Sequence, residues 1–160
     1  MLNSITDFFE NHLSLNSKPV ASKQNDEKVR LAAAIVMVEL TQVTLDSKPE
    51  DSKVVIEELS HYYSLSKEAA ILLENQAEQA DKSLTSLFPF TQLLNQHYSK
   101  QDKYRLINAL WDIAYQTESA DQLIAEDAYC HKISHLLHIP HAQLIQAKLT
   151  AEQKYQVKSK

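Results

Sequence analysis

The longest continuous hydrophobic stretch of the chain is residues 31–38, LAAAIVMV, eight residues in all. A helix that is apolar on every side has to be covered by its neighbours all round, so this stretch predicts a central, buried helix. Asp26 is a suitable N-cap, which places the helix at about residues 26–44. Aromatic residues at helical spacing, Phe88 with Phe90 and Trp111 with Tyr115, are also expected in the core.

The other hydrophobic positions recur at intervals of three and four residues, which is the spacing of amphipathic helices. Residues 2–13 form one such helix, and the polar, proline-containing residues 14–25 predict a linker. Capping signals and prolines mark the starts of later helices, at Pro49, at Ser66, near Ser86, at Ser99 and at Pro140, and another helix is expected over about residues 125–138. No stretch shows the alternation of a half-buried strand, so we predict an all-α fold of about seven or eight helices.

The two halves of the chain resemble each other. Residues 58–65, ELSHYYSL, match residues 132–139, KISHLLHI, at a constant offset of 74 positions. At closely similar offsets, Arg30 corresponds to Arg105, Glu39 to Asp112 and Thr44 to Thr117. Chance similarity between amphipathic helices is one explanation, and an internal duplication, which we prefer, is the other. The duplication predicts two pseudo-symmetric three-helix units packed as one domain over residues 26–158.

Composition removes several classes of function. The chain has no glycine, although phosphate-binding loops, dinucleotide-binding turns and nucleophile elbows depend on it. A net charge of −5, without a basic stripe, argues against nucleic acid as a partner. The single cysteine, Cys130, excludes a disulfide within the chain, and the N-terminus lacks a signal-peptide pattern. We therefore expect a cytoplasmic protein without a membrane span.

Carboxylates gather near the predicted loops and helix ends. Glu39 directly follows the apolar stretch, so we expect it to be partly buried and to need a hydrogen bond or a cationic partner. With its counterpart Asp112 it would belong to one or two acidic clusters able to bind a metal ion. The other members would be Asp46, Glu50, Asp51, Glu118, Asp121, Glu126 and Asp127. The alternative is that these residues cap helices and face solvent.

Histidines provide a second candidate metal site. His131, His135 and His138 fall on one stripe of a helix predicted over about residues 125–138. Such a series can bind Zn²⁺ or Ni²⁺, although an exposed polar stripe has the same pattern.

The evidence for an enzyme is weaker than the evidence for a metal site. His61 follows Glu58 at the spacing of a di-metal helix bundle, but Lys132 replaces the second glutamate that such a site needs.

Several segments, in order, resemble the TerB-like tellurite-resistance family. They are residues 88–95 (FPFTQLLN), 102–115 (DKYRLINALWDIAY) and 139–149 (IPHAQLIQAKL), with further likeness at 39–43 and 49–51. The resemblance covers about residues 27–150 and implies an all-α fold with a non-enzymatic role in bacterial stress. It also implies an acidic loop, alanine-aspartate-glycine, in each half, which has been linked to metal ions. Here Thr44 and Thr117 occupy the aspartate positions, which argues against an inherited metal site.

These observations lead to one functional hypothesis and one alternative. The first is a non-catalytic domain without a cofactor that acts in a tellurite- or metal-associated stress response, through protein contacts or weak metal-ion binding. Phe8 and Phe9 on the short first helix would form the surface for a protein partner, and a second copy of the chain is one such partner. The alternative is a dedicated divalent-cation binder that uses the acidic loops or His131, His135 and His138.

Overall fold

The computed structural model describes the backbone of residues 21–43, 49–116 and 120–158, and the side chains within 26–43, 49–116 and 123–155. In these ranges the chain forms seven helices and no strand. The helices are α2 (Ala21–Gln42), α3 (Pro49–Tyr63), α4 (Lys67–Lys82), α5 (Phe88–His97), α6 (Lys100–Ala114), α7 (Ala120–Leu136) and α8 (His141–Lys158). The all-α prediction is confirmed. The helix predicted at residues 2–13, with Phe8 and Phe9, lies outside the described residues.

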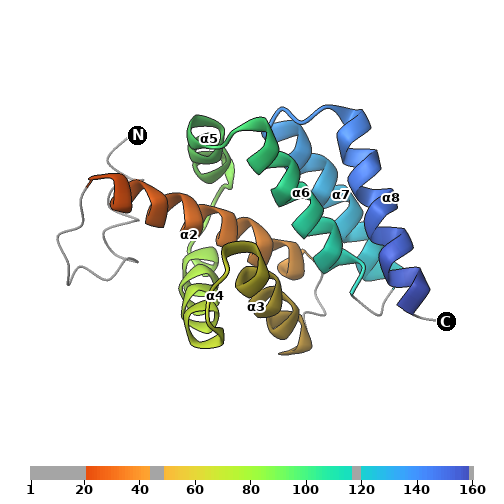
Figure 1. Ribbon diagram of the computed structural model, residues 1–160, viewed down its shortest axis with the longest axis horizontal. Helices are drawn as coiled ribbons and strands as arrows, with labels where there is room; N and C mark the ends of the chain where they lie inside the picture. The colour runs from red at the N-terminus through yellow and green to blue at the C-terminus, as the bar shows by residue number, and fades with distance from the viewer. Residues whose placement is uncertain (1–20, 44–48, 117–119, 159–160) are drawn as a thin grey trace.

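The apolar helix α2 is the centre of the domain, as its sequence predicts. Every residue from 31 to 38 is at most 2% exposed. The helix packs against α3, α4, α5, α6 and α7, and Figure 1 shows it crossing the middle of the domain with α3 and α4 on one side and α5 on the other. Three consecutive alanines, residues 32–34, keep this helix narrow, so that neighbours can approach its axis.

The second half of the chain forms a layer in which α6 packs against both α7 and α8, at one end of α2 in Figure 1. Trp111 is completely buried there, and its ring centroid lies 6.0 Å from that of Tyr115. Phe90 is buried as predicted, but Phe88 is 57% exposed. The expectation for Phe88 is wrong because two residues correspond to about 200° around a helix, which directs it away from the face of Phe90. No described helix is both long and apolar enough to cross a membrane.

Most helix starts follow the capping signals. The Ser66 hydroxyl accepts a hydrogen bond from the amide of Ala69 at 3.2 Å, and Ser99 and Asp102 form a reciprocal capping box with two bonds of 3.1 Å. The first described helix differs. It begins at Ala21, so residues 21–25 of the predicted linker are helical and Asp26 lies inside the helix. Alanine, lysine and glutamine in this segment have good helix propensity, which carries α2 past its expected cap.

Two helices end in a left-handed turn, a position that glycine usually occupies in proteins. Ser64, after α3, has φ of 53°, and His138, after α7, has φ of 57°. In both turns an amide donates back across the helix end: Leu65 to the carbonyl of Ser60, and Ile139 to the carbonyl of Ser134, each at 2.9 Å. These turns are 74 positions apart, the offset of the repeated segments. The duplication itself stays a prediction, to which the matching turns lend support.

Replacing Ser64 by glycine is expected to stabilise the protein by about 0.5–1 kcal/mol, because glycine adopts a positive φ without a Cβ clash. Ser83 is the matched control, since it also follows a helix but has φ of −99°. Ser83→Gly is expected to destabilise the protein by a similar amount, through the extra chain entropy of glycine when unfolded. Urea denaturation followed by Trp111 fluorescence measures both changes. Shifts of the same sign would contradict the strain assigned to Ser64.

Candidate functional site

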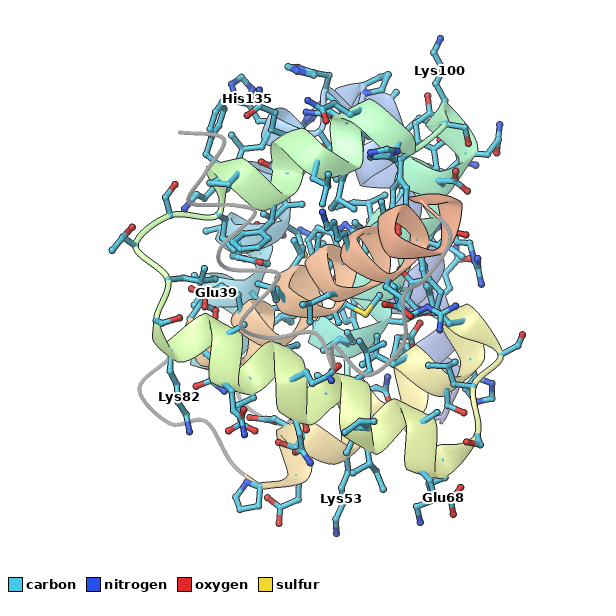
Figure 2. All side chains as sticks on the ribbon, turned by 90° about the vertical axis from the view of Figure 1, so that its left-hand side faces the viewer. Glu39, Lys53, Glu68, Lys82, Lys100 and His135 are labelled. Atoms are coloured by element: carbon cyan, nitrogen blue, oxygen red, sulfur yellow. The ribbon has the colours of Figure 1, made fainter. Side chains whose placement is uncertain are left out.

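Glu39 forms a pair with a second acid. It is half-buried near the end of α2, and Figure 2 shows it beside the connection from α4 to α5. Burial raises the pKa of Asp81 on α4 well above its ordinary value, and a hydrogen bond to Glu39 and the charge of Glu39 raise it further. A hydrogen bond between two carboxyl groups needs a proton on one of them. The hydrogen bond that Glu39 was expected to need is therefore one with the carboxyl group of Asp81, with a proton held between the two groups.

Asp112 belongs to a different group of residues. Its Oδ2 atom lies 3.4 Å from Nζ of Lys154 on α8. Burial, followed by the charge of Asp112, raises the pKa of Glu58 on α3 to about 7, while Lys154 opposes that rise. Asp112 and Lys154 also line a hollow of about 340 Å³ between α6 and α8. The two acids paired by the sequence repeat thus have separate partners: Glu39 has Asp81, and Asp112 has Lys154 and Glu58.

The other acidic residues predicted as metal ligands lie at helix ends, in the core or outside the described residues. Glu50 and Asp51 occupy the first turn of α3, where a negative charge favours the helix dipole. Glu126 is completely buried, and Asp127 Oδ1 accepts from Nζ of Lys148 at 2.7 Å. The side chains of Asp46, Glu118 and Asp121 lie outside the described residues. Among the side chains that the structure describes, no group of three or more histidine, cysteine or acidic residues could hold a metal ion.

The histidine stripe is shorter than its spacing suggests. Because α7 ends at Leu136, His138 lies in the turn that follows and does not continue the helical series. His131 has other neighbours: its Nε2 atom lies 3.7 Å from Asp127 Oδ2, and its ring centroid lies 6.0 Å from that of His141. His135 and His138 are exposed, as expected for a solvated stripe, and Figure 2 shows His135 at the surface.

A tyrosine–arginine cluster, consisting of Tyr62, Tyr63, Tyr98, Arg30 and Arg105, was not predicted from the sequence. The Tyr62 hydroxyl donates to the Tyr98 hydroxyl at 3.3 Å, and the Tyr63 and Tyr98 hydroxyls lie 3.1 Å apart. The guanidinium of Arg105 lies 4.1 Å from the centroid of the Tyr62 ring and donates to the Tyr62 carbonyl. The guanidinium of Arg30 lies 5.0 Å from the centroid of the Tyr63 ring. Two stacked cations and three linked phenols thus come together.

One sequence signal could have identified this cluster. Arg30 and Arg105 are the only arginines in the chain, and they stand at corresponding positions of the two halves. Arginine differs from lysine in stacking on aromatic faces and in presenting a planar fork of donors. The two arginines, in a chain whose other basic residues are lysines, therefore indicate positions where stacking or forked hydrogen bonding is needed.

Helix α4 exposes two large aliphatic side chains on a solvent face that carries charge only at its two ends, at Lys67 and Glu68 and at Lys82. Ile71 and Leu72 are 36% and 60% exposed, and the other exposed residues between Glu68 and Lys82 are Asn75 and Gln79. We call these four residues, Ile71, Leu72, Asn75 and Gln79, the α4 face. The opposite side of the helix packs on α2 and α3. Protein interfaces are depleted of charge at their centres, so the α4 face is a candidate contact surface.

A comparison with protein families decides the assignment. The model of the tellurite resistance protein TerB matches residues 30–149. The chain belongs to the TerB family. The resemblance inferred from the sequence is therefore confirmed, and the match extends from within α2 to within α8. No curated protein and no solved structure matched this TerB-family chain.

Proposed function

We propose that this TerB-family domain acts without catalysis, in a cytoplasmic response to tellurite or metal stress, by binding a protein partner. The observation that carries the proposal is the α4 face, where Ile71 and Leu72 are exposed together with Asn75 and Gln79. A non-catalytic role is supported by Cys130. It is completely buried, and burial, followed by the charge of Glu126, raises the pKa of its thiol. Such a thiol is a poor nucleophile.

Leu72→Lys is expected to abolish the tellurite tolerance that the unaltered chain restores to cells lacking its gene. A lysine at the centre of a contact surface has to be desolvated on binding, which opposes association. Leu149→Lys is the matched control, because Leu149 is 52% exposed on a different helix, α8. Neither surface change should alter stability by more than about 0.5 kcal/mol. The readout is growth on a tellurite series, with circular dichroism as the check on folding.

The possible results separate the parts of this proposal. Equal loss of tolerance in both variants, or full tolerance with Leu72→Lys, would contradict the role of the α4 face. Failure of the unaltered chain to restore tolerance would contradict the stress role. Sedimentation velocity tests whether the partner is a second copy of the chain. Dimers of the unaltered protein that Leu72→Lys converts to monomers would identify the α4 face as a homodimer contact.

A second candidate function, weak divalent-cation binding, is favoured by the Glu39–Asp81 pair. Two carboxyl groups in contact offer the oxygen ligands that Ca²⁺ prefers. Binding would displace the shared proton, so the affinity for Ca²⁺ is expected to rise with pH, by up to about tenfold per unit below the raised pKa of Asp81. Asp81→Asn should remove this pH dependence, whereas Glu57→Gln, an exposed change on α3, should preserve it.

Calorimetry with Ca²⁺, Zn²⁺ and Ni²⁺ at two pH values decides between the metal-binding alternatives. Zinc or nickel binding that is lost in His131→Ala but kept in Asp81→Asn would assign the ion to the histidines. Affinities on the order of millimolar or weaker for all three ions, at both pH values, would end the metal-binding proposal.

A further inference from the structure

The tyrosine–arginine cluster borders a pocket that neither proposed function uses. The pocket has a volume of about 240 Å³. At about 30 Å³ for each water, roughly eight waters would fill it, so it has room for a small organic molecule. Its polar lining comes from the ends of three helices: Tyr62 and Tyr63 from α3, His97 and Tyr98 from α5, and Asp102 and Arg105 from α6. Asp26 and Val29 of α2 complete the lining.

One of the three phenol protons is not used in hydrogen bonds between the phenols. Three hydroxyl groups carry three protons, and the Tyr62–Tyr98 and Tyr98–Tyr63 bonds use two of them. Tyr98 accepts from Tyr62 and keeps its own proton, and when it donates that proton to Tyr63 the two bonds run in one direction. The Tyr63 hydroxyl can then donate its own proton to a ligand. Hydrogen bonds in such a chain polarise one another, which strengthens the terminal donor.

Positive charge lies beside both ends of this chain, since Arg105 stacks on Tyr62 and Arg30 stacks on Tyr63. Burial raises the pKa of Tyr63, but the guanidinium groups of Arg30 and Arg105 both act to lower it. Burial also raises the pKa values of Tyr62 and Tyr98, with a smaller contribution from the carboxylate of Asp102, and at Tyr62 the charge of Arg105 opposes that rise. Both guanidinium groups thus act on Tyr63, so an acceptor with negative charge would be stabilised by them and by the Tyr63 hydroxyl.

Two contacts fix the side chain of Arg105 at the pocket, where it can bind a ligand. Its guanidinium is stacked on Tyr62 and bonded to a carbonyl, yet the residue stays exposed. Of the two acids in the lining, Asp102 accepts from the Ser99 amide at 3.1 Å in the capping box of α6, and Asp26 is exposed on α2. A guanidinium has five N–H donors in a fixed fork, a geometry that suits the oxygens of a phosphate.

We propose that this pocket binds a small organic molecule through a phosphate group, which lies against Tyr63 and is held by Arg105, while Arg30, stacked on the Tyr63 ring, adds positive charge nearby. The organic part would occupy the rest of the pocket, against the aromatic rings. This site is separate from the α4 face and from the Glu39–Asp81 pair, so it can fail or succeed independently of the functions proposed above.

Titration of the full chain with phenyl phosphate and with inorganic phosphate, followed by calorimetry and by NMR of the tyrosine rings, tests the proposal. We expect phenyl phosphate to bind at one site with a dissociation constant on the order of 1 mM or lower. Arg105→Gln should weaken binding by about tenfold or more, since a charge-assisted bond is lost. Tyr63→Phe, which keeps the ring and removes the donor, should weaken it by roughly three- to tenfold.

The controls are Lys132→Gln, which removes an exposed cation from α7, and Tyr115→Phe, which removes a phenol beside Trp111. Neither should change the affinity.

The remaining outcomes concern the ligand and the site. If inorganic phosphate binds more tightly than phenyl phosphate, with the same response to Tyr63→Phe, the site stands and free phosphate is its ligand. Absence of binding by both probes would overturn the proposal. Equal weakening by Lys132→Gln and Arg105→Gln would also overturn it, because removal of any exposed cation would then weaken binding and no specific site would be needed. Tyr63→Phe keeps the test decisive if Arg105→Gln fails to fold.

Discussion

Ile35→Ala is expected to lower the free energy of unfolding by about 2–5 kcal/mol. Ile35 has no exposed surface and lies in the part of α2 that is buried on every side. A cavity at this position cannot be closed by the movement of one neighbour, since α2 is surrounded by five other helices. The loss should therefore combine the transfer free energy of the deleted groups with a large cavity term.

Ile71→Ala provides the matched control for that substitution. Ile71 is 36% exposed on α4, and the same atoms are removed from a position that water already reaches. Its expected cost is below about 1 kcal/mol. Urea denaturation, followed by Trp111 fluorescence and by helical circular dichroism, measures both variants. Similar losses at Ile35 and Ile71 would contradict the central position of α2.

The protein is expected to lose stability as the pH rises from about 5 to 8, and Glu58→Gln should remove part of that loss. Folding raises the pKa of Glu58 from 4.5 to about 7. Between these values the folded state binds more protons than the unfolded state, so the free energy of unfolding falls as pH increases. Because Glu58 stays partly exposed, solvent screening reduces the expected contribution to roughly 1–2 kcal/mol.

Urea denaturation at pH 5 and pH 8 tests this pH dependence. At pH 8 Glu58→Gln should be more stable than the unaltered protein, and at pH 5 the difference should be small, because the carboxyl group of the folded protein is then already neutral. Glu57→Gln is the control, since Glu57 is the adjacent residue and is exposed. A Glu58→Gln variant that is equally stabilised at both pH values would show a packing effect instead of a proton linked to folding.

The sequence was most informative where local chemistry decides the structure. The all-apolar residues 31–38 predicted a buried helix correctly, and Ser66 and Ser99 mark helix starts through hydrogen bonds that their own neighbours complete. The errors also have local causes. Asp26 looked like a cap, but the residues before it are good helix formers. His138 looked helical, but it takes the left-handed position that ends α7.

The candidate sites could be predicted only in part, because their partners come from distant parts of the chain. Glu39 was expected to need a hydrogen bond, yet nothing near it in sequence points to Asp81. Tyr62 and Tyr98 become neighbours only when the ends of α3 and α5 meet, and each one alone has the pattern of an ordinary amphipathic helix end. A periodicity argument assigns a residue to a face. It cannot say which other face will lie opposite.

The burial of Cys130 has a practical consequence. A thiol reagent cannot reach this side chain while α7 stays packed in the core, and the chain has no other cysteine to compete for the reagent. Modification has to wait until α7 separates from its neighbours, in a local opening or in global unfolding. When the reagent is concentrated enough to react before the helix recloses, the labelling rate of the native protein measures how often this part of the domain opens.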